Sequence, residues 1–201
     1  MKRKDEVMSE GMDEDSATRQ RLFERISGCI KTGRVVLSSG KETDFYFDGR
    51  TISLDQEGAL LIARLVLEEL RKRPEISAIG GPTSGADPMV SSTGLLAWQE
   101  DHPLQLFYVR KEAKAHGMQR RIEGPALAAG TRVLLVDDVL TSGGSLLRAI
   151  EAVGEDTEAT VAGVLVLVDR EEGGRERLEE VGVEVIALFG RSEFSVLTKS
   201  P

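Results

Sequence analysis

The chain has 201 residues, with 26 Lys and Arg against 34 Asp and Glu and a formal net charge of −8, a length that suits one α/β domain with a short appendage. The acidic balance argues against a nucleic-acid-binding protein, and the single cysteine, Cys29, excludes a disulfide framework or a cysteine metal cluster. Because the sequence has no run of 18 apolar residues and no apolar N-terminal signal, we expect a cytoplasmic protein that does not bind membranes.

The first 50 residues are predicted to form a tail, a helix and a hairpin. Residues 1–17 are mostly charged and polar, so we expect a flexible N-terminal tail. Apolar residues recur at helical spacing from Thr18 to Lys31 and predict a helix there. Two β-prone runs, at 35–37 and 45–47, flank a polar turn and predict a two-stranded hairpin.

The predicted hairpin gathers aromatic residues and a cation. Phe45 and Tyr46 stand in its second strand, and Lys41 lies in its turn. Aromatic faces beside a cation suit a flat anionic ring. The alternative is that the hairpin covers the core with its aromatic side chains, and the residues alone leave both interpretations open.

The next segment alternates helices and strands. A capping-box pattern from Ser53 to Gln56 predicts the start of a helix that runs to about residue 72. A short strand at 76–79, a glycine-rich turn at 80–88, a helix at 89–99 and a strand at 104–109 follow. Glycines in such a turn either let a ligand approach the backbone or simply reverse the chain.

A strongly basic insert spans residues 110–124 of this acidic protein. It has little apolar content, so we expect a mobile loop outside the core. Cationic loops of this kind close over anions and exclude water; the alternative is an exposed charged loop without a role. The basic residues are Arg110, Lys111, Lys114, His116, Arg120 and Arg121.

The most informative stretch is 132–145. Four apolar residues, 133–136, predict a buried strand, and Asp137 and Asp138 follow directly. Backbone N–H groups in the small-residue turn at 141–145, and at the start of the next helix, favour an anion such as phosphate. The two carboxylates fit a ligand with vicinal hydroxyls and a divalent cation. A phosphorylated sugar with Mg²⁺ would suit both the small-residue turn and the two carboxylates. The alternative is a plain strand–turn–helix connection whose acidic side chains are solvated.

The strands predicted near residues 76, 104, 133, 161 and 183 alternate with helices. This pattern predicts an α/β fold with a mostly parallel central sheet and helices on both faces. Ligands bind beyond the carboxyl ends of such strands, where the turn at 80–88, the basic insert and the two acids would meet. Arg170 follows the strand near 161, and a guanidinium there would pair with a carboxylate.

Three segments together resemble the orotate phosphoribosyltransferases, a type I phosphoribosyltransferase family, over about residues 20–190. They are SSGKETDFYFDGR, which resembles the family's hood over the pyrimidine; RKEAKAHG, which resembles its catalytic loop; and VDDVLTSGGS, which matches its phosphoribosyl pyrophosphate (PRPP) loop. The resemblance implies the type I phosphoribosyltransferase fold with an N-terminal hood hairpin. After the tail at 1–17, a single domain at 18–201 would comprise a hood at about 18–52 and a core at about 53–190.

The resemblance also implies a role for each segment toward PRPP. Asp137 and Asp138 would bind the ribose hydroxyls, and Mg²⁺ would bind through PRPP, with Asp137 or Asp138 as a further ligand through water. The leaving pyrophosphate would meet Arg110, Lys111, Lys114 and His116, with the Arg110–Lys111 end reaching the neighbour's site in a homodimer. The 5′-phosphate would be held by Val139, Leu140, Thr141, Ser142, Gly143, Gly144 and Ser145.

Toward orotate, the resemblance implies contacts from Lys41, Thr141 and Arg170, with Phe45 and Tyr46 near the ring. One departure concerns the turn after the first sheet strand. Some members carry a Tyr-Lys pair there, whereas this sequence has Thr83-Ser84 and lacks that pyrophosphate-side lysine.

The implied reaction is transfer of the 5-phosphoribosyl group from PRPP to N1 of orotate, giving orotidine 5′-monophosphate and pyrophosphate. Lys114 and His116 are the residues expected to donate a proton to the leaving group, unless Mg²⁺ makes that unnecessary. Two rival functions are a purine phosphoribosyltransferase and a PRPP-binding regulator without catalysis. The hairpin and Arg170 favour a carboxylated base over a purine, and the basic loop favours an enzyme over a sensor.

Overall fold

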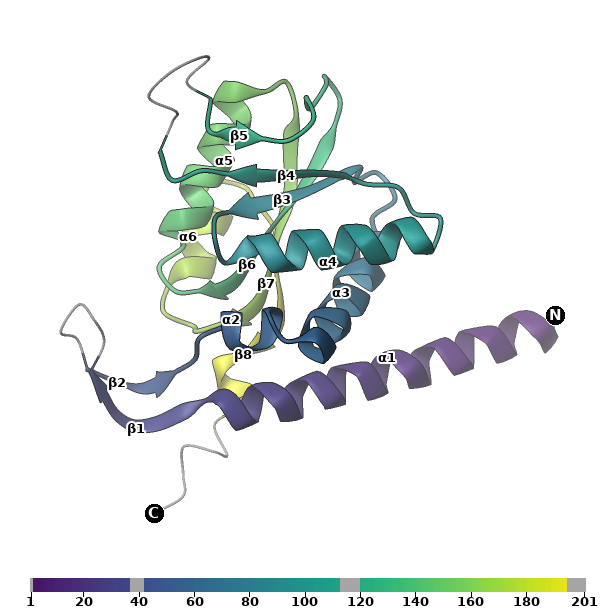
Figure 1. Cartoon of the computed structure of the whole chain (residues 1–201), viewed down its shortest axis with the longest axis vertical. Coiled ribbons are helices and arrows are strands. Elements are labelled where there is room, and N and C mark those ends of the chain that lie inside the picture. Colours follow the sequence, from purple (N-terminus) through teal and green to yellow (C-terminus); the bar gives the residue numbers. More distant parts are fainter. Residues whose placement is uncertain (1, 37–41, 113–119, 195–201) are drawn as a thin grey trace.

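The structure, a computed structural model, describes residues 2–36, 42–112 and 120–194. Its centre is a six-stranded sheet in the order β5-β4-β3-β6-β7-β8 (Figure 1). All neighbouring strands are parallel except β5, which pairs antiparallel with β4. The strands are β3 (Ala78–Pro82), β4 (Gln105–Val109), β5 (Ile122–Glu123), β6 (Arg132–Leu140), β7 (Thr160–Asp169) and β8 (Val185–Gly190). The predicted α/β class and the five predicted sheet strands are confirmed, while β5 lies inside the segment that was predicted as a loop.

The sheet is covered on both faces because its central strands are apolar on both sides. In β6, Leu134 and Val136 belong to one core cluster, and Val133 and Leu135 belong to the other. The first cluster contains residues of α3 (Gln56–Arg71) and α4 (Ala86–Gln99), and the second contains residues of α5 (Gly144–Asp156) and α6 (Gly174–Glu180). Alternate residues of a strand point to opposite faces, so one strand supplies both cores.

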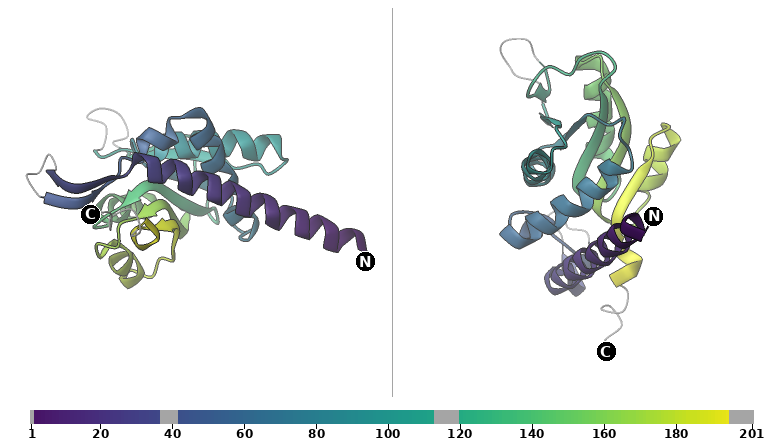
Figure 2. Two further views of the ribbon diagram at one scale, coloured as in Figure 1. Left: turned by 90° about the horizontal axis from the view of Figure 1, so that it is seen from below. Right: turned by 90° about the vertical axis from the view of Figure 1, so that its right-hand side faces the viewer.

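The N-terminal part differs from the prediction in one respect. The helix α1 runs from Lys2 to Cys29, so the segment 1–17, predicted as a flexible tail, is helical from Lys2 onward. This segment is rich in good helix formers and has no proline. Figures 1 and 2 show that the first part of α1 extends beyond the rest of the molecule. Within the described ranges, none of the helices is both long and apolar enough to cross a membrane.

The predicted hairpin is confirmed and leads towards the sheet. Strands β1 (Lys31–Val36) and β2 (Glu42–Tyr46) pair antiparallel. A short helix, α2 (Arg50–Ser53), follows, and the chain then enters α3. The described part ends with the 3₁₀ helix η1 (Arg191–Phe194).

The start of α3 corrects the predicted capping box. Ser53 is the last residue of α2, and the N-cap of α3 is Asp55, whose side chain accepts a hydrogen bond of 2.9 Å from the N–H of Gly58. Asp55 has the extended backbone conformation that an N-cap requires. Arg25 of α1 also pairs with Asp55, so this cap helps to attach α1 to the domain.

Candidate functional site

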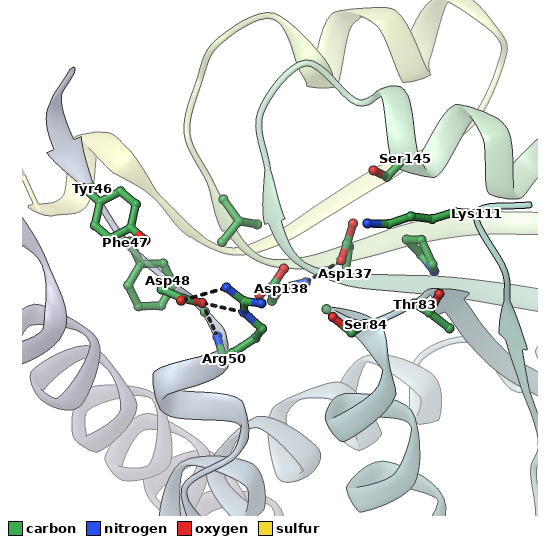
Figure 3. A pocket seen from close by; sticks show the side chains of 14 residues that line it. Tyr46, Phe47, Asp48, Arg50, Thr83, Ser84, Lys111, Asp137, Asp138 and Ser145 are labelled. Carbon is green, nitrogen blue, oxygen red and sulfur yellow. Dashed lines mark hydrogen bonds and ion pairs between the residues drawn. The ribbon is translucent and has the colours of Figure 1, made fainter. Parts of the chain in front are cut away.

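A cavity of about 320 Å³ lies where the carboxyl ends of β3 and β6 face the segment that follows β2 (Figure 3). Five separate parts of the chain line it, and most of the lining side chains are polar or charged. They are Tyr46–Arg50, Pro82–Gly85, Lys111, Asp137–Val139 and Ser145. The cavity therefore lies at the sheet edge where parallel α/β proteins bind ligands.

A second cavity of about 170 Å³ adjoins the first, because Asp137, Val139 and Ser145 line both. The turn between β6 and α5 forms its wall, and Gly143 adopts the left-handed conformation there, with φ of 74°. The first N–H groups of a helix have no intrahelical acceptor and attract anions. All the residues predicted to hold a phosphate, 139–145, line this second cavity.

Asp137 lines both cavities, and its neighbour Asp138 lines the first. Asp137 is 8% exposed, and its Oδ1 accepts a hydrogen bond of 3.0 Å from the backbone N–H of Asp138. Burial, reinforced by the charge of Asp138, raises the pKa of Asp137 well above its usual value, and burial also raises the pKa of Asp138. A ligand with hydroxyl donors would stabilise such a pair of carboxylates.

Two glycines let neighbouring segments pack closely against Asp138. A Cβ atom added to Gly85 would lie 2.5 Å from the Oδ1 atoms of both Asp137 and Asp138. A Cβ atom added to Gly49 would lie 2.6 Å from the Cβ atom of Asp138. Both positions therefore require glycine for close packing against the acid pair.

The segment after β2 supplies a fixed ion pair to the first cavity. The Nε–H and an Nη2–H of Arg50 donate to the two carboxylate oxygens of Asp48, each at 2.9 Å. These hydrogen bonds hold the pKa of Asp48 below its usual value. The sequence prediction assigned no role to Asp48, Gly49 or Arg50, although they directly follow the aromatic strand.

Of the basic residues predicted to act together, the structure describes Arg110 and Lys111, and these two have different surroundings. Lys111 lines the first cavity of its own chain and points towards Asp137 (Figure 3). Arg110 instead pairs with Glu123 of β5 at 3.2 Å. Arg121 is not part of a free loop, since it pairs with Glu155 of α5 at 2.5 Å. The predicted catalytic residues Lys114 and His116 lie outside the described residues.

The hairpin aromatics divide between the core and the cavity, as their alternation along a strand requires. Tyr46 lines the first cavity. Phe45 is fully buried and packs against Phe194 at a ring distance of 6.3 Å, so for this residue the core interpretation is correct. Lys41, predicted to contact the base, lies outside the described residues.

Of the remaining predicted site residues, Thr141 lines the phosphate-type cavity and Arg170 lines neither cavity. Arg170 is buried, pairs with Glu172 at 2.7 Å and donates to the Oγ1 of Thr43 in β2 at 3.3 Å. It therefore joins the end of β7 to the hairpin. Its Nε has no hydrogen-bond partner within the described part of the chain.

The carboxylates of Asp137 and Asp138 fit Mg²⁺ as a partial set of ligands. The described residues contain no cluster of three or more His, Cys, Asp or Glu side chains that could enclose a metal ion. Two neighbouring carboxylates do fit Mg²⁺, because this ion uses one or two carboxylates and takes its other ligands from water and phosphate oxygens.

Comparison with known proteins gives a consistent result. Residues 54–188 match the model of the phosphoribosyl transferase domain. An orotate phosphoribosyltransferase of Rhodopseudomonas palustris (strain BisB5) is 42% identical over 183 residues, which cover 89% of this chain and 97% of that protein. The crystal structure of the Mycobacterium tuberculosis H37Rv orotate phosphoribosyltransferase in complex with Fe(III) dicitrate is 40% identical, with a TM-score of 0.74 and coverage of 88% and 98%. The structure of that enzyme in complex with PRPP is 34% identical, with a TM-score of 0.72 and coverage of 89% and 99%.

Proposed function

We infer that this chain, which belongs to the orotate phosphoribosyltransferase family, transfers the 5-phosphoribosyl group from PRPP to N1 of orotate. The products are orotidine 5′-monophosphate and pyrophosphate, and the reaction belongs to pyrimidine biosynthesis. The observation that supports this most strongly is the pair of adjoining cavities that share Asp137.

The shape and charge of the two cavities support an assignment for each part of PRPP. The 5′-phosphate binds in the turn at 139–145, where the N-terminus of α5 favours an anion. The ribose hydroxyls donate hydrogen bonds to Asp137, which lines both cavities, and to Asp138, which lines the larger one. The diphosphate then extends into the larger cavity, towards Lys111 and the turn Pro82–Gly85.

The reaction breaks the bond between C1′ and the diphosphate oxygen and forms the bond between C1′ and N1 of orotate. Positive charge develops on the ribose and negative charge on the leaving group, so fixed cations that meet the leaving group lower the barrier. Lys111 is one such cation, and Lys114 and His116 are proposed to act with it, either of them donating a proton to the leaving oxygen. Bound Mg²⁺, held by PRPP with Asp137 or Asp138 as a further ligand through water, would neutralise diphosphate charge.

For orotate we propose contacts with Tyr46, Thr141, Arg170 and Lys41. The contact of Arg170 with orotate is supported by its buried Nε–H, which has no hydrogen-bond partner within the described residues. A buried donor without a partner costs free energy, and the carboxylate of the base would accept its hydrogen bond. Phe45 supports the site from the core and does not contact the base, since it is fully buried.

We also propose a homodimer in which the 110–124 loop contributes to the neighbour's site, although Lys111, at its start, lines the cavity of its own chain. Large apolar side chains are exposed on α4: Trp98 is 73% exposed and Leu95 is 63% exposed. Exposed aromatic and aliphatic groups of this size favour a protein interface. Sedimentation of the wild type and of Trp98→Glu tests this, and a wild type that sediments as a monomer at micromolar concentration would exclude it.

An orotate-consumption assay tests the proposed activity directly. Orotate should disappear only when both PRPP and Mg²⁺ are present, with one pyrophosphate released per orotate consumed. Initial rates with adenine and hypoxanthine separate this activity from that of a purine transferase. PRPP binding without pyrophosphate release, with any of the three bases, would indicate a regulator instead.

A further inference from the structure

The larger cavity has an unusual charge distribution for a site that would receive a diphosphate. Three aspartates line it, namely Asp48, Asp137 and Asp138. The turn Pro82–Gly85, on the diphosphate side, carries no charged side chain. Among the described lining residues the cations are Lys111 and Arg50. These two are therefore the described cations that can meet a diphosphate bound beside the acid pair.

Three hydrogen bonds to Asp48 hold Arg50 at the cavity. Asp48 occupies one edge of its guanidinium group, formed by Nε and Nη2, and also accepts a hydrogen bond of 3.2 Å from the backbone N–H of Arg50. A guanidinium has a second edge, formed by Nη1 and Nη2, which can grip another pair of anionic oxygens. The side chain is 54% exposed, and its two hydrogen bonds to Asp48 use Nε and Nη2 but not Nη1.

Asp138 lies between the segment that carries Arg50 and the turn Pro82–Gly85. Gly49 packs against one side of Asp138, and Gly85 packs against the acid pair from the turn. Figure 3 shows the guanidinium of Arg50 between Asp48 and Asp138, on the side of Asp138 away from Lys111. Arg50 and Lys111 therefore face the space above the acid pair from two directions.

We propose that Arg50 is a catalytic residue that binds the diphosphate group of PRPP and stabilises the leaving pyrophosphate from the side opposite Lys111. Asp48 is the positioning residue that fixes its guanidinium. This inference deepens the proposed function and rests on it. With three aspartates in the lining, a bound diphosphate requires cations beside it, and Arg50 is one of the two that the described lining supplies.

The test compares Arg50→Ala with the wild type and with Arg71→Ala. Arg71 is a matched control, since it is 44% exposed and pairs with Glu68 and Glu100 away from the cavity. Loss of a hydrogen bond to a charged group costs about 10- to 150-fold in affinity. We therefore expect Arg50→Ala to raise the KM for PRPP and the inhibition constant of pyrophosphate by about that factor and to lower kcat. The KM for orotate should stay within about twofold, and Arg71→Ala should match the wild type.

Three further variants separate a diphosphate contact from a structural role. Arg50→Lys keeps the charge but loses the fork and should recover part of the pyrophosphate affinity. Asp48→Asn should weaken the binding of pyrophosphate less than Arg50→Ala does. Ser84→Lys, added to Arg50→Ala, supplies a cation from the opposite side of Asp138 and should restore pyrophosphate affinity.

Two results would overturn the proposal. One is a folded Arg50→Ala enzyme with unchanged pyrophosphate inhibition. The other is a selective loss of affinity for orotidine 5′-monophosphate with affinity for uridine 5′-monophosphate retained, because these nucleotides differ in the base carboxylate and this would place Arg50 at the base. If the wild type consumes no orotate, the proposed function fails first, so the two failures are distinguishable.

Discussion

Replacing Gly85 by alanine tests whether the acid pair holds the ribose. The added Cβ would lie 2.5 Å from the Oδ1 atoms of Asp137 and Asp138, about 1 Å closer than a normal contact. The backbone of Gly85 is right-handed helical, with φ of −64° and ψ of −40°, so alanine is not strained there. The carboxylates must move instead. Losing one of their hydrogen bonds to the sugar costs about 1.5–3 kcal/mol, which raises the Kd for PRPP by about 10- to 150-fold.

Calorimetric titration with PRPP in the presence of Mg²⁺ measures this effect, and circular dichroism confirms that the variant is folded. Gly154→Ala in α5 is the matched control, because nothing lies within 4 Å of its added Cβ. The control should bind PRPP normally and gain about 0.5–1 kcal/mol of stability. A folded Gly85→Ala protein with a wild-type Kd for PRPP would show that the acid pair does not bind the sugar.

Three further predictions concern charge, assembly and capping. The pKa of Asp137 is raised in the folded chain above its unfolded value, so its ionised form opposes folding at neutral pH, and lowering the pH through the raised pKa relieves this cost. The Asp137→Asn variant should therefore melt at a higher temperature than the wild type at pH 7, and this difference should shrink at acid pH. The variant should have no turnover. If the basic loop acts on the neighbouring subunit, an equal mixture of the inactive Asp137→Asn and Lys114→Ala proteins should recover about a quarter of wild-type activity, because about half of the dimers are heterodimers and each of these has one intact site of two. No recovery after subunit exchange would mean that the loop acts on the site of its own subunit. Asp55→Ala should cost about 1 kcal/mol of unfolding free energy by removing the cap of α3, and Asp55→Asn should retain most of it; equal chemical-denaturation midpoints for the two would refute the cap.

The parts of the site that the sequence predicted are those formed by local chain geometry. An apolar strand, two acids and a small-residue turn are adjacent in the sequence, and the strand direction fixes where they end. Asp137, Asp138 and the turn at 139–145 therefore lie where the pattern placed them. The alternation of β2 is equally local, but which of Phe45 and Tyr46 faces the core depends on how the hairpin packs, and this decided the role of Phe45.

Contacts between distant segments could not be predicted in the same way. Arg50 enters the cavity only because Gly49 packs on Asp138, and nothing in the sequence links residues so far apart. Arg121, although part of the basic insert, pairs with Glu151 and Glu155 of α5, a contact between segments far apart in the sequence. The polarity of residues 1–17 predicts a flexible tail, but a polar segment is also compatible with a helix, which is what the structure has from Lys2 onward.

The phosphate turn also depends on a residue outside the motif that identifies it. A Cβ atom on Gly174, in the first turn of α6, would lie 2.2 Å from the carbonyl oxygen of Thr141 and 3.0 Å from the backbone nitrogen of Gly143. An ancestral or engineered chain that kept all the residues of 132–145 but had a larger side chain at position 174 would have a deformed phosphate turn. Surveys that score function from that short signature should therefore check position 174 before assuming an intact anion site.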